Sequence, residues 1–332
     1  MTSGSIPAKH GRGVILALGE ILIDLIPAKS AMRISESGAV IKAVSGSSGI
    51  FSCAAQRLGG NSGIICKLGR DSLSKLAMDI LRRQRLDLRG VTLSEEGQIG
   101  LAFLEYTPDG RNYQYYRERS VGSRLRPDDI DGSLISEAFA VHYPGMLLNL
   151  SPEMSSACAR LTELAKEHNI AVSFDPNLRQ ELSRGSEALE KVRNAVSTAD
   201  IITPTLSEAR AITGLDDIGK IIRALHSLGP KTVAVTRDSE GSVLSTDGYA
   251  AIARALPVNE VDPTGAGDVF AAALCTGIRE GMHLKQLAAF ANTAAGLAVT
   301  KRGAIGTALP SRRAVNSRMD AVSVTVAKLS EL

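Results

Sequence analysis

The order of apolar and polar positions divides this chain into short apolar runs and longer mixed segments. Val14–Leu18 is a continuous apolar run that ends at Gly19, which is the pattern of a strand buried on both faces. From Phe139 onward, strand-like and helix-like segments alternate, at 140–143, 151–168, 170–174, 186–198, 201–203, 207–213, 218–228 and 232–235. This alternation predicts βαβ units, and therefore a parallel sheet covered by helices, with ligands beyond the carboxyl ends of its strands.

Two segments of the first half have a different pattern. Residues 32–44 and 98–117 alternate loosely between polar and apolar side chains, as exposed antiparallel strands do. The second segment contains the turn sequence Thr107-Pro108-Asp109-Gly110 and therefore predicts a hairpin. Between the two segments, the small residues at 45–50 lead into a predicted helix at 51–58, which ends at Gly59-Gly60.

Length and composition limit the classes of protein to consider. With 332 residues, of which 44% are hydrophobic, the chain can bury the core of one large α/β domain or of two smaller ones. Its 38 Lys and Arg against 35 Asp and Glu give a net charge of +3 without a long basic block. We therefore expect neither a nucleic-acid partner nor a membrane-surface partner.

The cysteines and the apolar runs bear on the compartment. The four cysteines lack Cys-x-x-Cys spacing, which argues against a zinc site or a disulfide framework and favours reduced thiols in the core. No apolar run reaches the length of a membrane span, and the polar residues 1–12 lack the apolar core of a signal peptide. We expect a cytoplasmic protein whose residues 1–12 are flexible.

The richest candidate chemistry lies at 261–270. Gly265, Ala266 and Gly267 carry almost no side chain, so their backbone N–H groups can approach one bound anion. The apolar residues 269–274 predict a helix, whose N-terminus attracts negative charge such as phosphate. Asp268, in the first turn of that helix, could act as general base for an attacking hydroxyl. A lone Gly-Ala-Gly-Asp match is more often a loop with an Asp cap, so this motif needs support from other parts of the sequence.

A resemblance to a known family supplies that support. Asp262-Pro263-Thr264-Gly265-Ala266-Gly267-Asp268 resembles the C-terminal signature of the PfkB, or ribokinase-like, carbohydrate kinases, and family-like segments recur at 19–20, 58–60, 174–179 and 301–304. The resemblance spans about residues 14–310. It implies an α/β fold: a three-layer α/β/α sandwich with a mostly parallel sheet and a small β-sheet lid. It also implies a single kinase domain at 13–310, with lid segments at about 30–45 and 97–120 and a C-terminal tail at 311–332.

The same resemblance implies the reaction and its cofactors, ATP and Mg²⁺. Gly265, Ala266 and Gly267 would form the anion hole for the transferred phosphoryl group, and Asp268 would deprotonate a sugar hydroxyl. Glu208 would orient magnesium-bound water, and Asp262 would lie near a site for a monovalent cation such as K⁺. The implied nucleotide site comprises Thr205, Thr236, Arg237, Gly241, Gly267 and Asn292.

The substrate implied by the resemblance is a small sugar. Gly-Glu-x-Leu-x-Asp at 19–24 is similar to the fructokinase branch, whereas Tyr115 and Arg117 are similar to ketohexokinase-like and 2-keto-3-deoxygluconate kinases. We favour a neutral ketohexose such as fructose or tagatose, with 2-keto-3-deoxygluconate as the alternative and a nucleoside as a less favoured one. Family members often dimerise through the lid, so a homodimer is expected. The implied sugar site comprises Asp24, Gly46, Tyr115, Arg117 and Arg179.

Several positions depart from the family pattern. Ser45 and Ile50 stand where relatives have Gly and the sugar-binding Asn, and Thr205 stands where they have Asn. Asp238 departs within the nucleotide loop, and Ala102 replaces a pocket tyrosine of the 2-keto-3-deoxygluconate kinases. The departures at Ile50, Thr205 and Asp238 motivate an alternative of another class, a non-catalytic sugar or nucleotide sensor. Intact Asp268 argues against it, because a sensor needs no base.

One further motif is a near match to a nucleotide-binding loop. Residues 214–221 nearly spell a Walker A sequence, but Ile221 stands where a Ser or Thr must hold magnesium, and Asp216 and Asp217 would crowd the phosphates. We interpret this segment as a turn between two helices.

Overall fold

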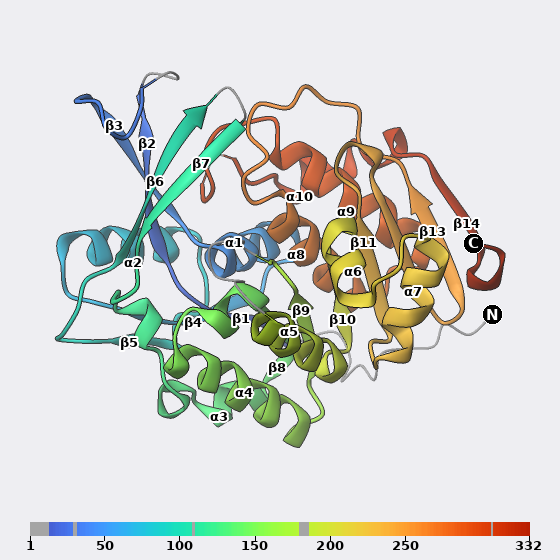
Figure 1. The fold of residues 1–332 in the computed structure, drawn as a ribbon, viewed down its shortest axis with the longest axis horizontal. Helices are drawn as coiled ribbons and strands as arrows, with labels where there is room; N and C mark the ends of the chain where they lie inside the picture. Colours follow the sequence, from blue (N-terminus) through green and yellow to red (C-terminus); the bar gives the residue numbers. More distant parts are fainter. Residues whose placement is uncertain (1–12, 29–31, 108–109, 179–185, 307) are drawn as a thin grey trace.

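A ten-stranded sheet runs through the centre of the protein (Figure 1). The computed structural model describes residues 13–28, 32–107, 110–178, 186–306 and 308–332. The strand order is β14-β13-β12-β11-β10-β9-β8-β1-β4-β5. The strands are β1 Val14–Leu18, β4 Ser62–Leu68, β5 Val91–Leu93, β8 Ala138–Pro144, β9 Ala171–Asp175, β10 Ile201–Ile202, β11 Thr232–Thr236, β12 Ser242–Thr246, β13 Tyr249–Ala253 and β14 Val324–Lys328.

In this sheet β5, β4, β1, β8, β9, β10 and β11 pair in parallel, and β12, β13 and β14 join antiparallel, so the sheet is mostly parallel as predicted. Strand β1 shows why both faces are covered. Ile15 and Ala17 belong to one hydrophobic cluster, whereas Val14, Leu16 and Leu18 belong to a second cluster on the opposite face. A strand buried on both sides requires helices on both sides.

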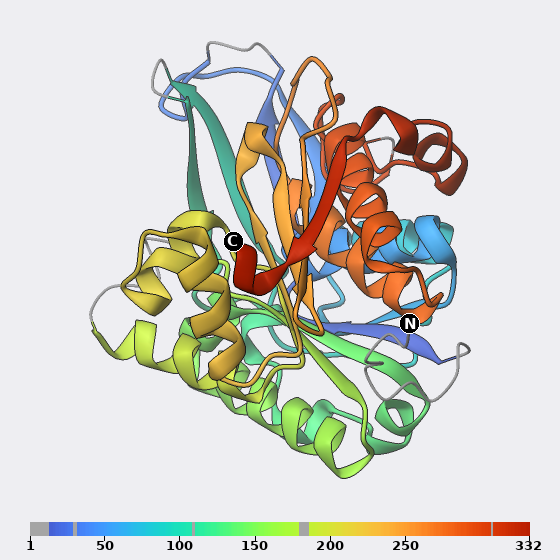
Figure 2. The same ribbon diagram turned by 90° about the vertical axis from the view of Figure 1, so that its right-hand side faces the viewer.

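The helices form the two outer layers of the sandwich (Figure 2). Helices α1, α2, α8, α9 and α10 contribute to the first cluster, and α3 to α7 contribute to the second. The three-layer α/β/α architecture is therefore confirmed. The helices are α1 Ser47–Gly59, α2 Ser72–Arg83, α3 Gly132–Ser136, α4 Pro152–Glu167, α5 Ser186–Thr198, α6 Leu206–Thr213, α7 Ile218–Ser227, α8 Ala266–Arg279, α9 Leu284–Ala298 and α10 Arg312–Asn316. Short 3₁₀ turns lie at Gly122–Arg124, Pro127–Asp129, Gly145–Asn149, Asp238–Glu240, Met319–Ala321 and Leu329–Glu331.

A separate four-stranded sheet, here called the lid, extends away from the main sheet (Figure 1). Its order is β3-β2-β6-β7, with β2 Leu22–Pro27, β3 Val40–Ser45, β6 Gly100–Thr107 and β7 Gly110–Tyr116. The expected lid segments, 30–45 and 97–120, contain three of these strands. They omit β2, because its apolar residues directly follow β1 and look like a continuation of the core.

The C-terminal segment also differs from the expectation. Residues 311–332 were expected to be a tail beyond the domain, yet β14 pairs antiparallel with β13 from Tyr249↔Lys328 to Ala253↔Val324. This edge strand is largely exposed, so its sequence lacks the continuous apolar run that marks the central strands. The expected domain boundary at 310 therefore does not coincide with the edge of the sheet.

Other expectations concern the termini, turns and cysteines. The expected flexible segment 1–12 lies outside the described residues. The near-Walker segment connects α6 to α7, because Gly214 ends α6 with φ 71° and the Asp217 side chain caps α7 by accepting from the Lys220 N–H. All four cysteines are buried and unpaired. In the described part of the chain, no helix has the length and hydrophobicity needed to span a bilayer.

Candidate active site

A cavity of about 440 Å³ lies between the lid and the carboxyl ends of the central strands. Its size lies within the range of small-molecule sites. Three parts of the fold contribute to its wall. The lid supplies Asp24, Tyr113 and Tyr115, with Arg117 just beyond β7; the start of α8 supplies Gly265, Ala266, Gly267 and Asp268; and the strand ends supply Asp175, Asn177, Thr205, Glu208 and Thr236.

The N-terminus of α8 forms the floor of this cavity. Gly265, the N-cap residue of α8, takes the left-handed conformation with φ 78° and, as a glycine, makes no side-chain cap hydrogen bond. The Ala266 N–H donates to the Pro263 carbonyl at 3.2 Å, so this helix start can bind an anion through all three loop N–H groups only if that turn bond is exchanged. A Cβ on Gly265 would lie 3.0 Å from Ile50, whereas a Cβ on Gly267 would meet open space. Ile50, which departs from the family pattern, thus packs an apolar side chain against the anion loop.

Asp268 lies in the first turn of α8 and is 8% exposed, at the wall of the cavity. The Ser47 hydroxyl at the start of α1 donates a hydrogen bond to Oδ1 of Asp268. Gly46 brings α1 close enough for this contact: it has φ 110°, and a Cβ there would lie 2.4 Å from the carbonyl oxygen of Glu20. The Asp268 carboxylate therefore lies at the cavity wall between the starts of α1 and α8, where a general base could reach a bound hydroxyl.

Asp24 lies in the centre of the lid sheet. It pairs with Ala43 on β3 and Ala102 on β6, and Ala102 in turn pairs with Tyr115 on β7. Partners in register share one face of a sheet, so small alanines flank Asp24 in a row that ends at Tyr115. The pKa of Asp24 is raised to about 6, chiefly by burial. A hydrogen bond from Ser45 lowers this pKa, whereas the negative charge of Asp262 raises it further.

The Arg117 guanidinium stacks over the ring of Tyr115, with 4.1 Å between Cζ and the ring centroid. Its Nη1 lies 3.5 Å from Oε2 of Glu20, and both side chains are buried. Tyr113 connects the lid to the floor, because its hydroxyl lies 3.0 Å from the hydroxyl of Thr264, next to Gly265.

Glu208 lies at the opposite wall, at the start of α6. One carboxylate oxygen accepts from the Leu178 N–H at 2.7 Å, and the other accepts from the N–H and hydroxyl of Thr205 at 2.8 and 2.9 Å. Thr205 also caps α6 and pairs with Thr236 at the end of β11. This capping box fixes the carboxylate at the cavity edge.

Comparison with known proteins assigns the family of this site. Residues 14–312 match the family described as "pfkB family carbohydrate kinase". The chain belongs to this family. It is a sugar kinase, a phosphotransferase that acts on an alcohol group, as predicted. Its likeness extends over nearly the whole chain rather than to the Gly-Ala-Gly motif alone.

The relatives of this pfkB-family chain include several fructokinases. It is 33% identical over 306 residues to probable fructokinase-2 of Arabidopsis thaliana, covering 89% of this chain and 92% of the relative. It is 31% identical to fructokinase-1 of Zea mays, covering 89% and 94%. A protein named provisionally as ribokinase II from Escherichia coli, solved with ATP and Mg²⁺, superposes with a TM-score of 0.87 at 25% identity, covering 93% of this chain and 99% of that one. The ribokinase-like fold is confirmed.

Part of the expected pfkB-family nucleotide site lies outside the cavity wall. Asn292 is buried on α9 and donates to the Ser242 hydroxyl and the Ala288 carbonyl, both at 2.8 Å. Arg237 pairs with Glu240, and Gly241 follows in the same turn with φ 98°. Asp238, the departure in this turn, is exposed and so points away from the buried wall.

Two more expected residues remain to be placed. Asp262 is buried and accepts from the Thr264 N–H at 3.0 Å and the Gly303 N–H at 3.3 Å, so it joins the anion loop to the 301–304 loop. Arg179 lies outside the described residues.

Ser47 and Tyr113, which line the cavity, and Glu20, which pairs with the cavity-lining Arg117, were not among the predicted site residues. Ser47 meets Asp268 across 221 positions of the chain, so no local pattern marks it. Glu20 did carry a signal, since it stands in a family-like segment, but its partner could not be inferred from that segment.

Proposed function

We propose that this enzyme transfers the γ-phosphoryl group of ATP to a primary hydroxyl of a neutral ketohexose, fructose or tagatose. The observation that supports this most is that Asp268, the glycine-containing start of α8 and the lid residues line one cavity. Relatives named fructokinases and a similar structure solved with ATP and Mg²⁺ agree with it.

Asp268 is the proposed base. It would accept the proton of the sugar hydroxyl as that oxygen attacks phosphorus, while ADP leaves. The N–H groups of Gly265, Ala266 and Gly267 would stabilise the charge that builds on the transferred group. The barrier is lowered mainly by positioning and by preorganised charge, because phosphoryl transfer leaves little covalent chemistry to the protein.

The proposed nucleotide and metal sites lie along the strand ends. Thr205 and Thr236 line the cavity, and Arg237, Gly241 and Asn292 would extend the nucleotide site beyond it. Mg²⁺ keeps several waters when it binds, and the Glu208 carboxylate, fixed by three hydrogen bonds at the cavity edge, would orient one of those waters. When bound, Mg²⁺ neutralises phosphate charge. K⁺ near Asp262 remains a prediction.

The sugar would lie under the lid. Asp24 would accept hydrogen bonds from sugar hydroxyls, and Tyr115 would pack against the ring or chain. Arg117 also favours the second candidate, 2-keto-3-deoxygluconate, because a guanidinium binds carboxylates well. However, the Arg117 charge is already paired with Glu20, and the cavity also contains Asp24, so we favour the neutral sugar.

The test is a coupled assay of ADP release with ketohexoses, sugar acids and nucleosides, for the wild type and Asp268→Asn. We expect fructose or tagatose to give the highest kcat/KM. The variant should lose at least ~10²-fold in kcat, the usual contribution of a general base, with ATP affinity by calorimetry nearly unchanged. Asp247→Asn, at an exposed turn, is the matched control. Near-normal turnover of Asp268→Asn would remove Asp268 from its role.

A further inference from the structure

A buried ion pair joins the β1–β2 connection to the end of the lid. Glu20 and Arg117 are 3% and 4% exposed in their side chains, and Oε2 and Nη1 lie 3.5 Å apart. Ser120 donates to the other carboxylate oxygen of Glu20 at 2.6 Å. The site is tightly enclosed, because a Cβ on Gly100 would lie 2.9 Å from Oε1 of Glu20 and one on Gly122 would lie 2.8 Å from its Cγ.

The two charges depend on each other. Nη1 and Nη2 of Arg117 have no hydrogen-bond acceptor among the described residues, so the guanidinium charge is offset mainly by Glu20. Burial raises the pKa of Glu20 to about 7, while the Arg117 charge and the bond from Ser120 oppose that rise. Above about pH 7 Glu20 is mostly ionised, and the pair that it forms with the cavity-lining Arg117 is then close to neutral.

We propose that Glu20 is a specificity-determining residue that neutralises Arg117 and thereby makes the sugar site select neutral sugars over sugar acids. This inference rests on the proposed function. A substrate carboxylate near Arg117 must compete with Glu20 for the guanidinium and tolerate a second negative charge. Without the Glu20 charge, the same guanidinium becomes an uncompensated buried cation, which binds a carboxylate strongly.

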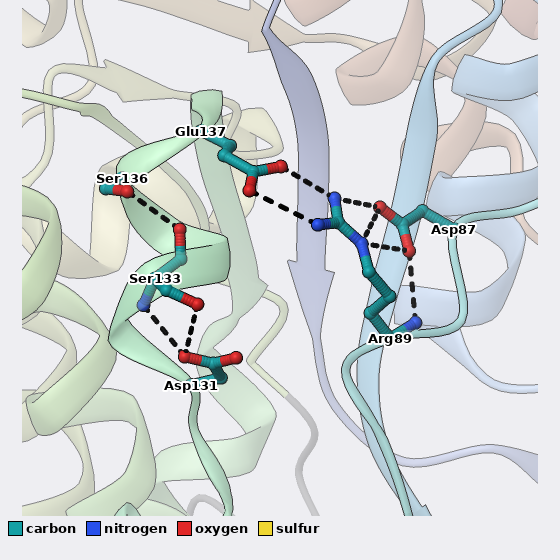
Figure 3. Close-up of polar contacts among 6 residues, drawn as sticks. All are labelled: Asp87, Arg89, Asp131, Ser133, Ser136 and Glu137. Carbon is teal, nitrogen blue, oxygen red and sulfur yellow. Dashed lines mark hydrogen bonds and ion pairs between the residues drawn. The ribbon is translucent and has the colours of Figure 1, made fainter.

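The experiment measures kcat/KM for 2-keto-3-deoxygluconate and for fructose in the wild type and Glu20→Gln, at a pH well above the Glu20 pKa of about 7. We expect the ratio of the acid to the neutral sugar to rise at least about tenfold, because one unpaired buried charge changes affinity by that factor or more. Glu137→Gln is the matched control: Glu137 pairs with Arg89 through two hydrogen bonds but is 54% exposed (Figure 3). It makes the same chemical change and should leave the ratio unaltered.

The double variant Glu20→Gln/Arg117→Gln tests the mechanism. Because the gain requires the guanidinium, the ratio should return to within about threefold of the wild type. An unchanged ratio in Glu20→Gln, an equal rise in Glu137→Gln, or a rise that persists in the double variant each overturns the proposal.

Two further arms keep the result decisive. If Glu20→Gln does not fold, Glu20→Asp retracts the carboxylate by one methylene and should raise the ratio by at least about twofold. If the wild type phosphorylates another neutral sugar but not fructose, the proposed substrate is wrong, and that sugar replaces fructose in the ratio. If it phosphorylates no neutral sugar, the proposed selectivity is overturned with it.

Discussion

At the scale of single residues, the buried carboxyl group of Asp24 lowers the free energy of unfolding while it serves the proposed sugar site. Asp24 is 6% exposed, and its pKa is raised from 3.8 to about 6, chiefly by burial. Between these values the native carboxyl is protonated while the unfolded one is ionised. The free energy of unfolding therefore falls as pH rises from about 4 through about 6, and the cost persists at higher pH.

Asp24→Asn should separate stability from function. Removing the buried charge should raise the free energy of unfolding by about 2 kcal/mol at pH 8 and by less at pH 5. The KM for the ketohexose should rise about tenfold or more, since an acceptor for sugar hydroxyls is lost. Urea unfolding at both pH values and steady-state kinetics measure these effects. A variant that is less stable at pH 8, or one with an unchanged KM, contradicts this account of Asp24.

How much of the site the sequence predicts depends on how local its chemistry is. Gly265 to Asp268 were predictable because the anion-binding N–H groups and the base lie within one helix turn. Contacts such as Ser47 with Asp268 and Tyr113 with Thr264 join segments 221 and 151 positions apart. These partners are set by how the lid and α1 pack, which residue patterns within one segment do not encode.

At the scale of elements, a pair of hydroxyls joins the lid to the floor of the cavity. Tyr113 of β7 and Thr264 beside the anion loop lie 3.0 Å apart. This contact holds the lid over the place where phosphoryl transfer is proposed. A lid that excludes water favours the sugar as acceptor over hydrolysis.

Tyr113→Phe removes one of these hydroxyls while keeping the ring. We expect ATP hydrolysis without sugar to rise about two- to fivefold relative to sugar phosphorylation, because water enters more readily under a less firmly held lid. ADP release with and without fructose measures the ratio. Tyr116→Phe is the control, since the only hydrogen bond made by the Tyr116 hydroxyl in the described structure is an exposed one that it accepts from the Gln114 side chain. Equal ratios in both variants would show that the Tyr113 contact does not limit water access.

Elements were predictable to different degrees for a physical reason. The buried strands β1, β8, β9 and β11 show in the sequence because burial on both faces demands continuous apolar runs. Strand β2 has a similar run but belongs to the lid sheet, and β14 is largely exposed at an edge. The composition of a strand indicates how deeply the strand is buried. The neighbouring strand with which it pairs is determined by the whole fold.

At the scale of the whole molecule, the lid leaves an unusual surface. Strand β3 is an outer strand of the lid, so one row of its backbone groups has no partner within that sheet. Val40 and Ile41 on this strand are 42% and 57% exposed. An exposed apolar edge strand is a template for pairing with another chain. Charged residues normally protect such edges, and the exposed Lys42 stands next to these two apolar residues, so the protection of β3 is partial.

We propose that two copies of the chain pair through the β3 edge, consistent with the homodimer expected from the family resemblance. Light scattering after size exclusion should give about twice the 35.0 kDa of one chain. Ile41→Lys places a charge in the contact and should raise the dimer dissociation constant at least about tenfold. Leu93→Lys makes the same change on β5, at a site that is 51% exposed and outside the lid, and should leave the dimer intact.

Because the lid also supplies Asp24 and Tyr115, the monomer formed by Ile41→Lys should bind the sugar more weakly while its ATP affinity is retained. A wild type that is monomeric at micromolar concentration would instead leave β3 as an unpaired edge.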